Sequence, residues 1–272
     1  MRKPARGLGL ALLLLLALVP ETRSQRAPPA EVDPEVARLL ERALHHAETL
    51  RKQFRTIEYD AEMRVQEWDA HGTLRGRAKA TAVMRPGAEQ PMTFVSREID
   101  GKVRLPEPEK RRKRKRAEKE KTLLEFAEER QIAERFAFTV VGTETVAGQR
   151  ASRVAFHPRP IGRRKDTTDR FLETISGTAW VSATTEKLVK FELRLDQPLQ
   201  LFWIFAVLRE LEIRYELLVP GEVLGRSKLQ VKFALHTPVT SLRQQHDVQL
   251  DNFRRRSESN VFAALRPAEA TH

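Results

Sequence analysis

Cysteine is absent from this sequence of 272 residues. No disulfide can form, so the folded state depends on its hydrophobic core alone. The thiol to which a bacterial lipoprotein attaches its lipid is missing as well. The absence predicts a mature protein that is soluble or peripherally bound to a membrane, and not lipid-anchored.

Long apolar runs are scarce too. The N-terminal run from Leu8 to Val19 is shorter than the roughly 20 residues that span a bilayer. Three basic residues precede it, and Pro20 and the small residues Thr22 and Ser24 follow it. This order is typical of a secretory signal peptide cleaved near Ser24, with an uncleaved membrane anchor as the alternative. The protein is therefore expected outside the cytoplasm, in the periplasm.

The sequence also lacks a catalytic motif. His45 and His46 are adjacent, so they point to different sides of a helix and do not form a two-histidine metal site. No serine lies in a nucleophile elbow, and no glycine-rich loop follows a strand. These absences predict a protein that is not an enzyme and carries no metal or cofactor. A hydrolase would require distant histidines and carboxylates to converge in one cleft.

The positive charge is local. The formal net charge is +12, but residues 109–121 alone hold nine basic and three acidic residues. Export excludes nucleic acid as the partner of this insertion (106–121), and the run has no interleaved aromatics. A solvated loop is the simplest interpretation; an anionic membrane surface or an envelope protein is the functional one. Its candidate contact residues are Lys110, Arg111, Arg112, Lys113, Arg114, Lys115 and Arg116.

Hydrophobic periodicity divides the chain into elements. Pro34 to Phe54 has apolar residues at steps of three and four, with Asp33 as N-cap, which predicts an amphipathic helix. From Ile57 the period changes to two, which indicates half-buried antiparallel strands. Strands are expected at 59–65, 74–84, 92–99, 138–141, 151–157, 177–182, 187–195, 211–217, 229–235 and 245–253. A helix is expected at 122–136 and a surface loop at 158–169. These elements predict an antiparallel meander with a helix packed against it.

One segment does not alternate. Leu199 to Leu208 is a nearly unbroken apolar stretch that contains Phe202, Trp203 and Phe205. It is too short to span a membrane. Three interpretations are open: a buried core helix, the lining of a lipid cavity, or contact with a membrane or partner.

The middle of the chain resembles a known family. Val141–Gly148 with Ser152–Pro158, and Ile175–Ser182 with Thr185–Leu195, resemble two strand pairs of the bacterial outer-membrane lipoprotein-sorting (LolA/LolB-like) proteins. The resemblance covers roughly residues 33–254 through short, degenerate motifs. The basic insertion and the apolar 199–208 segment depart from the family pattern.

The resemblance implies a fold and a function. The expected fold is α+β, mainly antiparallel β: a strongly curved open sheet, or half-barrel, of about nine to eleven strands. The N-terminal helix and further helices are expected on its concave side. Such a fold implies a carrier of lipids or lipoprotein acyl chains. A single domain is expected at 33–256, after a linker at 25–32 and before a charged tail at 257–272.

Apolar inward positions of the strands supply the candidate ligand site. Its residues are Tyr59, Met63, Phe94, Trp180, Phe191, Leu193, Ile213, Tyr215 and Phe233. The leading hypothesis is a non-catalytic periplasmic carrier of a hydrophobic ligand. The alternative is a structural or interaction protein of the cell envelope, with a filled core and no cavity.

Overall fold

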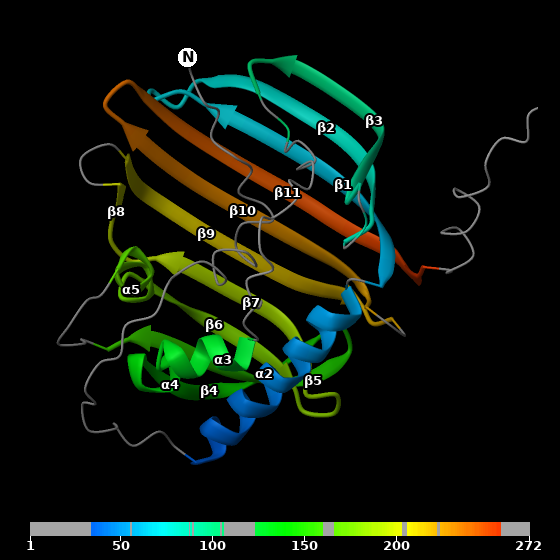
Figure 1. Cartoon of the computed structure of the whole chain (residues 1–272), viewed down its shortest axis with the longest axis vertical. Coiled ribbons are helices and arrows are strands. Elements are labelled where there is room, and N and C mark those ends of the chain that lie inside the picture. Colours follow the sequence, from blue (N-terminus) through cyan, green and yellow to red (C-terminus); the bar gives the residue numbers. More distant parts are fainter. Residues whose placement is uncertain are drawn as a thin grey trace, which may run out of the picture.

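The computed structural model describes residues 34–54, 56–86, 88, 90–103, 105, 123–159, 166–202, 206–221 and 224–256. Within these ranges the chain forms one curved antiparallel sheet with four helices on one side of it (Figure 1). The helices are α2 (Pro34–Phe54), α3 (Leu123–Glu129), α4 (Ile132–Arg135) and α5 (Thr167–Leu172). The open sheet of eleven strands confirms the predicted fold class. The predicted signal peptide, linker, basic insertion and tail lie outside the described residues.

The strands follow the predicted alternation closely. In chain order they are β1 (Ile57–Trp68), β2 (Leu74–Met84), β3 (Met92–Gly101), β4 (Phe136–Val146), β5 (Gln149–Pro158), β6 (Ile175–Ser182), β7 (Leu188–Leu195), β8 (Leu199–Phe202), β9 (Ala206–Val219), β10 (Arg226–Thr237) and β11 (Thr240–Arg255).

Strand order departs from a simple meander at two places, where β1 pairs with β11 and where β7 pairs with β9. The sheet runs β3-β2-β1-β11-β10-β9-β7-β6-β5-β4, with β8 paired to β9. The first strand therefore pairs with the last, from Ile57 opposite Arg255 to Trp68 opposite Arg243. This pairing joins the β1–β3 hairpins to the rest of the sheet and leaves β3 and β4 as its two edges.

The register gives the sheet two chemically distinct faces. One row of paired residues crosses it through Val65, His246, Val231, Ile213, Leu193, Gly177, Phe156 and Phe138. Ile132 of α4 and Leu172 of α5 pack into the same apolar cluster, so this is the helix-covered inner face. The adjacent row is Lys79, Arg64, Asp247, Gln230, Arg214, Glu192 and Thr178, which belongs to the polar outer face.

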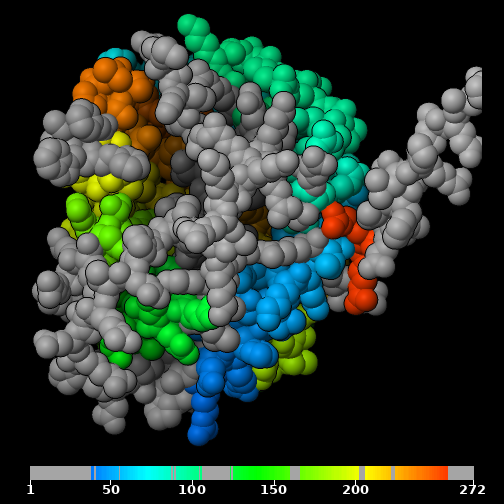
Figure 2. Space-filling model, viewed as in Figure 1, coloured from blue at the N-terminus to red at the C-terminus, as the bar shows by residue number. Residues whose placement is uncertain are grey.

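Helix α2 crosses the inner side near one end of the strands (Figure 1) and forms much of the lower surface in Figure 2, where it is blue. Its last residue, Phe54, packs on Tyr59 with ring centroids 5.3 Å apart. Buried Glu48 accepts a hydrogen bond of 2.9 Å from the backbone amide of Leu123, the first residue of α3. Burial disfavours the charged carboxylate, but this bond and those from Arg51 keep the pKa of Glu48 below its ordinary value.

Two sequence predictions near α3 to α5 are corrected. The helix expected at 122–136 is broken, because Gln131 adopts a left-handed φ of 52° and Phe136 already belongs to β4. Part of the loop expected at 158–169 is helical: Asp166 caps α5 by accepting from the amide of Asp169. Asp169 is fully buried and binds the guanidinium groups of Arg130 (3.1 Å) and Arg135 (2.7 Å).

The described residues of the apolar 199–208 segment, 199–202 and 206–208, are strands and not a helix. They form β8 and the start of β9, where Leu199 pairs with Leu208. Both side chains are buried in the inner-face cluster. The buried-helix interpretation is therefore wrong, although its core burial is right. Among the described helices, none combines the length and apolar character needed to cross a membrane.

Candidate functional site

Two buried regions of the inner face are called here the aromatic wing and the alanine wing; a further cluster of Ile57, Tyr59 and Ala61 packs against Phe54 of α2. The aromatic wing covers β4–β7 and the adjoining part of β9, and centres on Phe136, Phe156, Leu193 and Ile213. The alanine wing covers β1–β3 and centres on Ala78, Ala80, Ala82 and Met63. β10 and β11 lie between them, and Val231 and Phe233 of β10 belong to the same buried cluster as the aromatic wing.

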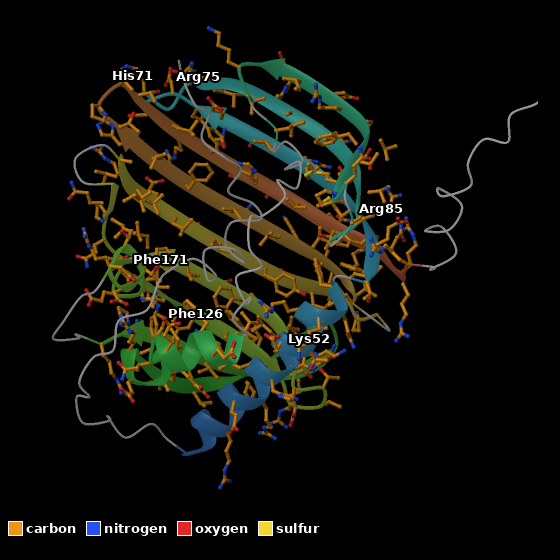
Figure 3. All side chains as sticks on the ribbon, in the orientation of Figure 1. Lys52, His71, Arg75, Arg85, Phe126 and Phe171 are labelled. Atoms are coloured by element: carbon orange, nitrogen blue, oxygen red, sulfur yellow. The ribbon has the colours of Figure 1, made fainter. Side chains whose placement is uncertain are left out.

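Large rings fill the aromatic wing. Phe136 meets Phe156 edge-on with centroids 5.7 Å apart, and Phe156 stacks with Phe191 at 5.9 Å. Gly177 makes the space for this stack, because a Cβ there would lie 2.6 Å from the Phe156 ring. Phe171 of α5 and Phe126 of α3 lie on the same side of the sheet (Figure 3). Such aromatic pairs contribute beyond the area they bury.

In the alanine wing, the segment that follows β3 fills the space that aromatic rings fill in the other wing. The side chains of Ala78, Ala80 and Ala82 are at most 5% exposed. Val103 and Leu105 follow β3 and pack into the same cluster. Lys102 donates its amide to the carbonyl of Arg75 at 2.9 Å, which holds the start of this segment against β2. Methyl side chains therefore leave room for the returning segment.

The centre of the inner face is less covered. Five inward-facing apolar side chains of β10 and β11 are half-buried, although Val231 and Phe233 on the same face of β10 are buried. These half-buried residues are Leu229, Leu235, Leu242, Val248 and Leu250. Tyr215 on β9 is also half-buried, and burial raises its pKa while a hydrogen bond with Ser227 lowers it. We call this central strip the inner strip.

A short polar chain interrupts the inner strip. The amide Nε2 of Gln244 donates to Oε2 of Glu67 at 2.7 Å, and Gln244 Oε1 lies 3.0 Å from His246 Nε2. Glu67 and Gln244 are each 8% exposed. The ring of Phe233 stacks on His246 at 5.9 Å. Burial lowers the pKa of His246 to about 4, so its imidazole is neutral at neutral pH.

Most predicted cavity residues share the inner face. Tyr59 and Met63 lie on the buried side of β1, and Phe94 packs on the alanine wing. Phe191, Leu193, Ile213 and Phe233 belong to or border the aromatic wing, and Tyr215 pairs with Phe191. Burial alone raises the pKa of Tyr59 to about 12, and its ring stacks on Phe253 at 5.1 Å.

The predicted membrane or partner contacts are mostly not described. Phe202 ends β8, while Trp203, Phe205 and Lys110–Arg116 lie outside the described residues.

Trp180 is separated from that set. It pairs with Lys190, whereas its neighbour Ala179 pairs with Phe191 on the inner face. Its indole Nε1 donates to Glu144 at 2.7 Å, and the Lys190 ammonium lies 4.4 Å from its ring centroid. Trp180 is 4% exposed and packs in a separate apolar cluster with Val146, Ala151, Val189 and Leu217. Strand alternation alone does not show which side of β6 faces the helices.

The polar chain is the part of the site that sequence reasoning missed. Glu67 continues the buried alternation of β1, which begins at Ile57. A carboxylate in an inward register was therefore a visible signal. The contributions of Gln244 and His246 were not visible, since they depend on the pairing of β1 with β11.

A recess in the described structure lies away from the inner strip. It encloses about 620 Å³ beside α2 and the turn after β6, where Arg42 pairs with Glu186 at 2.6 Å. His45, His46 and Arg38 also line it. Its lining is polar, so it does not have the character expected of a site for an acyl chain.

Comparison with known proteins gives structural likeness only. No protein-family model matches the sequence, and no curated protein matches it significantly. A LolA superfamily protein from Nitrosomonas europaea is 10% identical, with 87% of this chain and 98% of that chain covered and a TM-score of 0.28. A putative outer-membrane lipoprotein-sorting protein domain from Vibrio parahaemolyticus is 12% identical, with coverages of 82% and 97% and a TM-score of 0.27. The matches thus include the superfamily that the sequence resembles.

A third similar structure is that of a complex. The MucA/MucB complex of Pseudomonas aeruginosa is 10% identical over 82% of this chain and 99% of that chain, with a TM-score of 0.24. Such low identities and TM-scores carry no functional argument. The strand order and register of this chain define its fold.

Proposed function

We propose that this protein is a non-catalytic, extracytoplasmic binding protein that holds a hydrophobic ligand, a lipid or acyl chain, on the inner strip. One observation carries the proposal. Apolar side chains such as Leu229, Leu242 and Val248 face the helix-covered side of the sheet, yet they are only half-buried. Covering such a surface with an apolar ligand is favourable by about 25 cal/mol per Å². Residues 33–256 would form the single domain that carries this site.

Native mass spectrometry of the protein purified from its own envelope tests the proposal. A bound lipid at one-to-one stoichiometry is expected, or uptake of lipid when the purified protein is incubated with liposomes. Leu229→Gln should reduce occupancy on the order of tenfold, because it places an amide against the acyl chain. Gln230→Ala, on the outer face of the same strand, is the matched control and should bind normally. A ligand-free mass before and after liposome treatment would contradict the proposal.

The second candidate is an interaction protein of the envelope, and the edge strand β3 favours it. Val95 is 71% and Ile99 is 47% exposed, and β3 ends the described sheet. An open strand edge with apolar side chains can pair with a strand from another protein. The same mass spectra would then show an added protein chain in place of lipid. Val95→Lys should remove that chain, and its retention in the variant would exclude this edge as the contact.

A further inference from the structure

In the polar chain on the inner strip, the donor and the acceptor of each hydrogen bond can be assigned. A carboxylate only accepts hydrogen bonds, and the Arg75 guanidinium lies 3.9 Å from the Glu67 carboxylate. Gln244 therefore turns its amide nitrogen to Glu67 and its carbonyl oxygen to His246. Figure 3 shows Arg75 at the end of the sheet near the β1–β2 turn.

This assignment fixes the histidine tautomer. Because Gln244 Oε1 can only accept, the Nε2 of His246 must carry the proton and donate it. In a neutral imidazole the other nitrogen, Nδ1, is then an acceptor with a free lone pair. Within the described part of the chain, Nδ1 makes no hydrogen bond. The inner strip therefore presents one unsatisfied acceptor among apolar side chains.

The surroundings of that acceptor are apolar on both sides. His246 pairs with Val65 on β1 and with Val231 on β10, and both valines are buried. Its ring lies beside Phe233. A ligand lying along the inner strip would thus have its hydrocarbon against the leucines of β10 and β11. Its polar end could meet the histidine where the two wings come together.

We infer that the Glu67–Gln244–His246 chain selects the head group of the bound amphiphile, and that this head group is uncharged and donates a hydrogen bond, as a hydroxyl does. The inference rests on the proposed function, since it requires an amphiphile on the inner strip. A hydroxyl would donate to Nδ1 and complete the chain. A carboxylate or phosphate would instead face a lone pair, with the negative charge of Glu67 behind it.

Arg75 does not reverse this preference. Its guanidinium lies 3.9 Å from Oε1 of Glu67, whereas Gln244 binds Oε2 of the same carboxylate. The other charged neighbour, Asp247, lies on β11 in the outer register, opposite Arg64. The negative charge of Asp247 acts on the imidazole, and the carboxylate of Glu67 lies at the other end of the polar chain, so an anionic head group is disfavoured.

Matched amphiphiles test the inference. Monopalmitoylglycerol and palmitate share one acyl chain, and at pH 8 the first is a neutral diol while the second is an anion. Dissociation constants are measured with the whole mature protein, below the aggregation concentrations of both probes. The diol should bind at least about tenfold more tightly, which corresponds to the roughly 1.4 kcal/mol of one hydrogen bond.

Three variants test whether His246 causes the tighter binding of monopalmitoylglycerol. His246→Phe keeps a ring beside Phe233 but removes the acceptor, so the two dissociation constants should come within about threefold of each other. His246→Gln retains an acceptor and should keep part of the preference. Gln245→Leu lies on the outer face of β11 and should change neither value.

The outcomes separate this inference from the proposed function. If both probes bind the unaltered protein equally well, head-group selection fails while the hydrophobic site stands. If the preference is present but survives His246→Phe, the polar chain is not its cause and the inference is overturned. If neither probe binds, both conclusions fail. Should His246→Phe not fold, the affinity ratio of the unaltered protein and the His246→Gln result still decide the question.

Discussion

The two wings of the sheet bury their inner faces by opposite means. In the aromatic wing, phenylalanine rings from neighbouring strands fill the space directly, with Phe156 stacked on Phe191 over Gly177. In the alanine wing, methyl groups leave the space empty, and Val103 and Leu105 occupy it. Both solutions exclude water. The comparison teaches that small inward residues on a strand predict a covering segment of chain, and large ones predict a filled sheet.

The largest effect on this comparison is expected from removing one ring from the aromatic wing. Phe156→Ala should lower the free energy of unfolding by about 3–5 kcal/mol, because the ring contacts three other rings and its loss leaves a cavity. Chemical denaturation measures the change. Val140→Ala on β4, at a side chain 44% exposed, is the control and should cost under about 1 kcal/mol. A similar loss at both positions would mean that the wing is not close-packed.

His246, at the boundary between the wings, should make the free energy of unfolding depend on pH, with an effect of intermediate size. The folded state depresses the pKa of His246 from 6.5 to about 4 through burial, so this residue favours folding fully above pH 6.5. That contribution is lost as the pH falls from 6.5 to about 4, and amounts to roughly 3 kcal/mol. Denaturation midpoints across this range measure it.

His246→Phe is the reference variant for that titration, since it cannot be protonated. Its stability should fall less than that of the unaltered protein between pH 6.5 and 4. The carboxylates titrate in both proteins, so only the difference between them reports on the histidine. Parallel curves would show that the imidazole is not buried in the folded state.

The smallest expected effect comes from overfilling the alanine wing. Ala80 is fully buried, and Ala80→Leu adds three carbon atoms where Val103 and Leu105 already pack. A loss of about 1–3 kcal/mol in the free energy of unfolding is expected. Ala133→Leu on the exposed side of α4 is the matched control and should change stability by less than about 0.5 kcal/mol. If Ala80→Leu were neutral, the covering segment would not be packed tightly on β2.

Much of the fold could be predicted because its signals are local. Alternation from Ile57 to Val65 defines one buried side of β1 whatever the strand pairs with, and Pro34 starts α2 as expected. The same local signals failed at Gln131, where one left-handed residue ends a helix that the apolar pattern continues. They also failed in the apolar segment 199–208, because a run without alternation does not distinguish a helix from two paired buried strands.

Chemistry on the inner face depended on pairing between distant residues. Glu67 meets Gln244 across 177 positions of sequence, and no local pattern brings the two together. Trp180 shows the same limit in another way. Alternation along β6 separates it from Ala179, but only the pairing with β5 and β7 decides which of them faces the helices.

The sequence by itself determined the strands, the long N-terminal helix and the absence of disulfides, because period and composition are properties of neighbouring residues. Tertiary structure decided which strands are neighbours, which face is covered and where a polar chain crosses an apolar surface. The polar chain arises when β1 pairs with β11, a contact between the two ends of the described sheet segment, Ile57 and Arg255. Side chains that never meet along the chain become one surface only through that pairing.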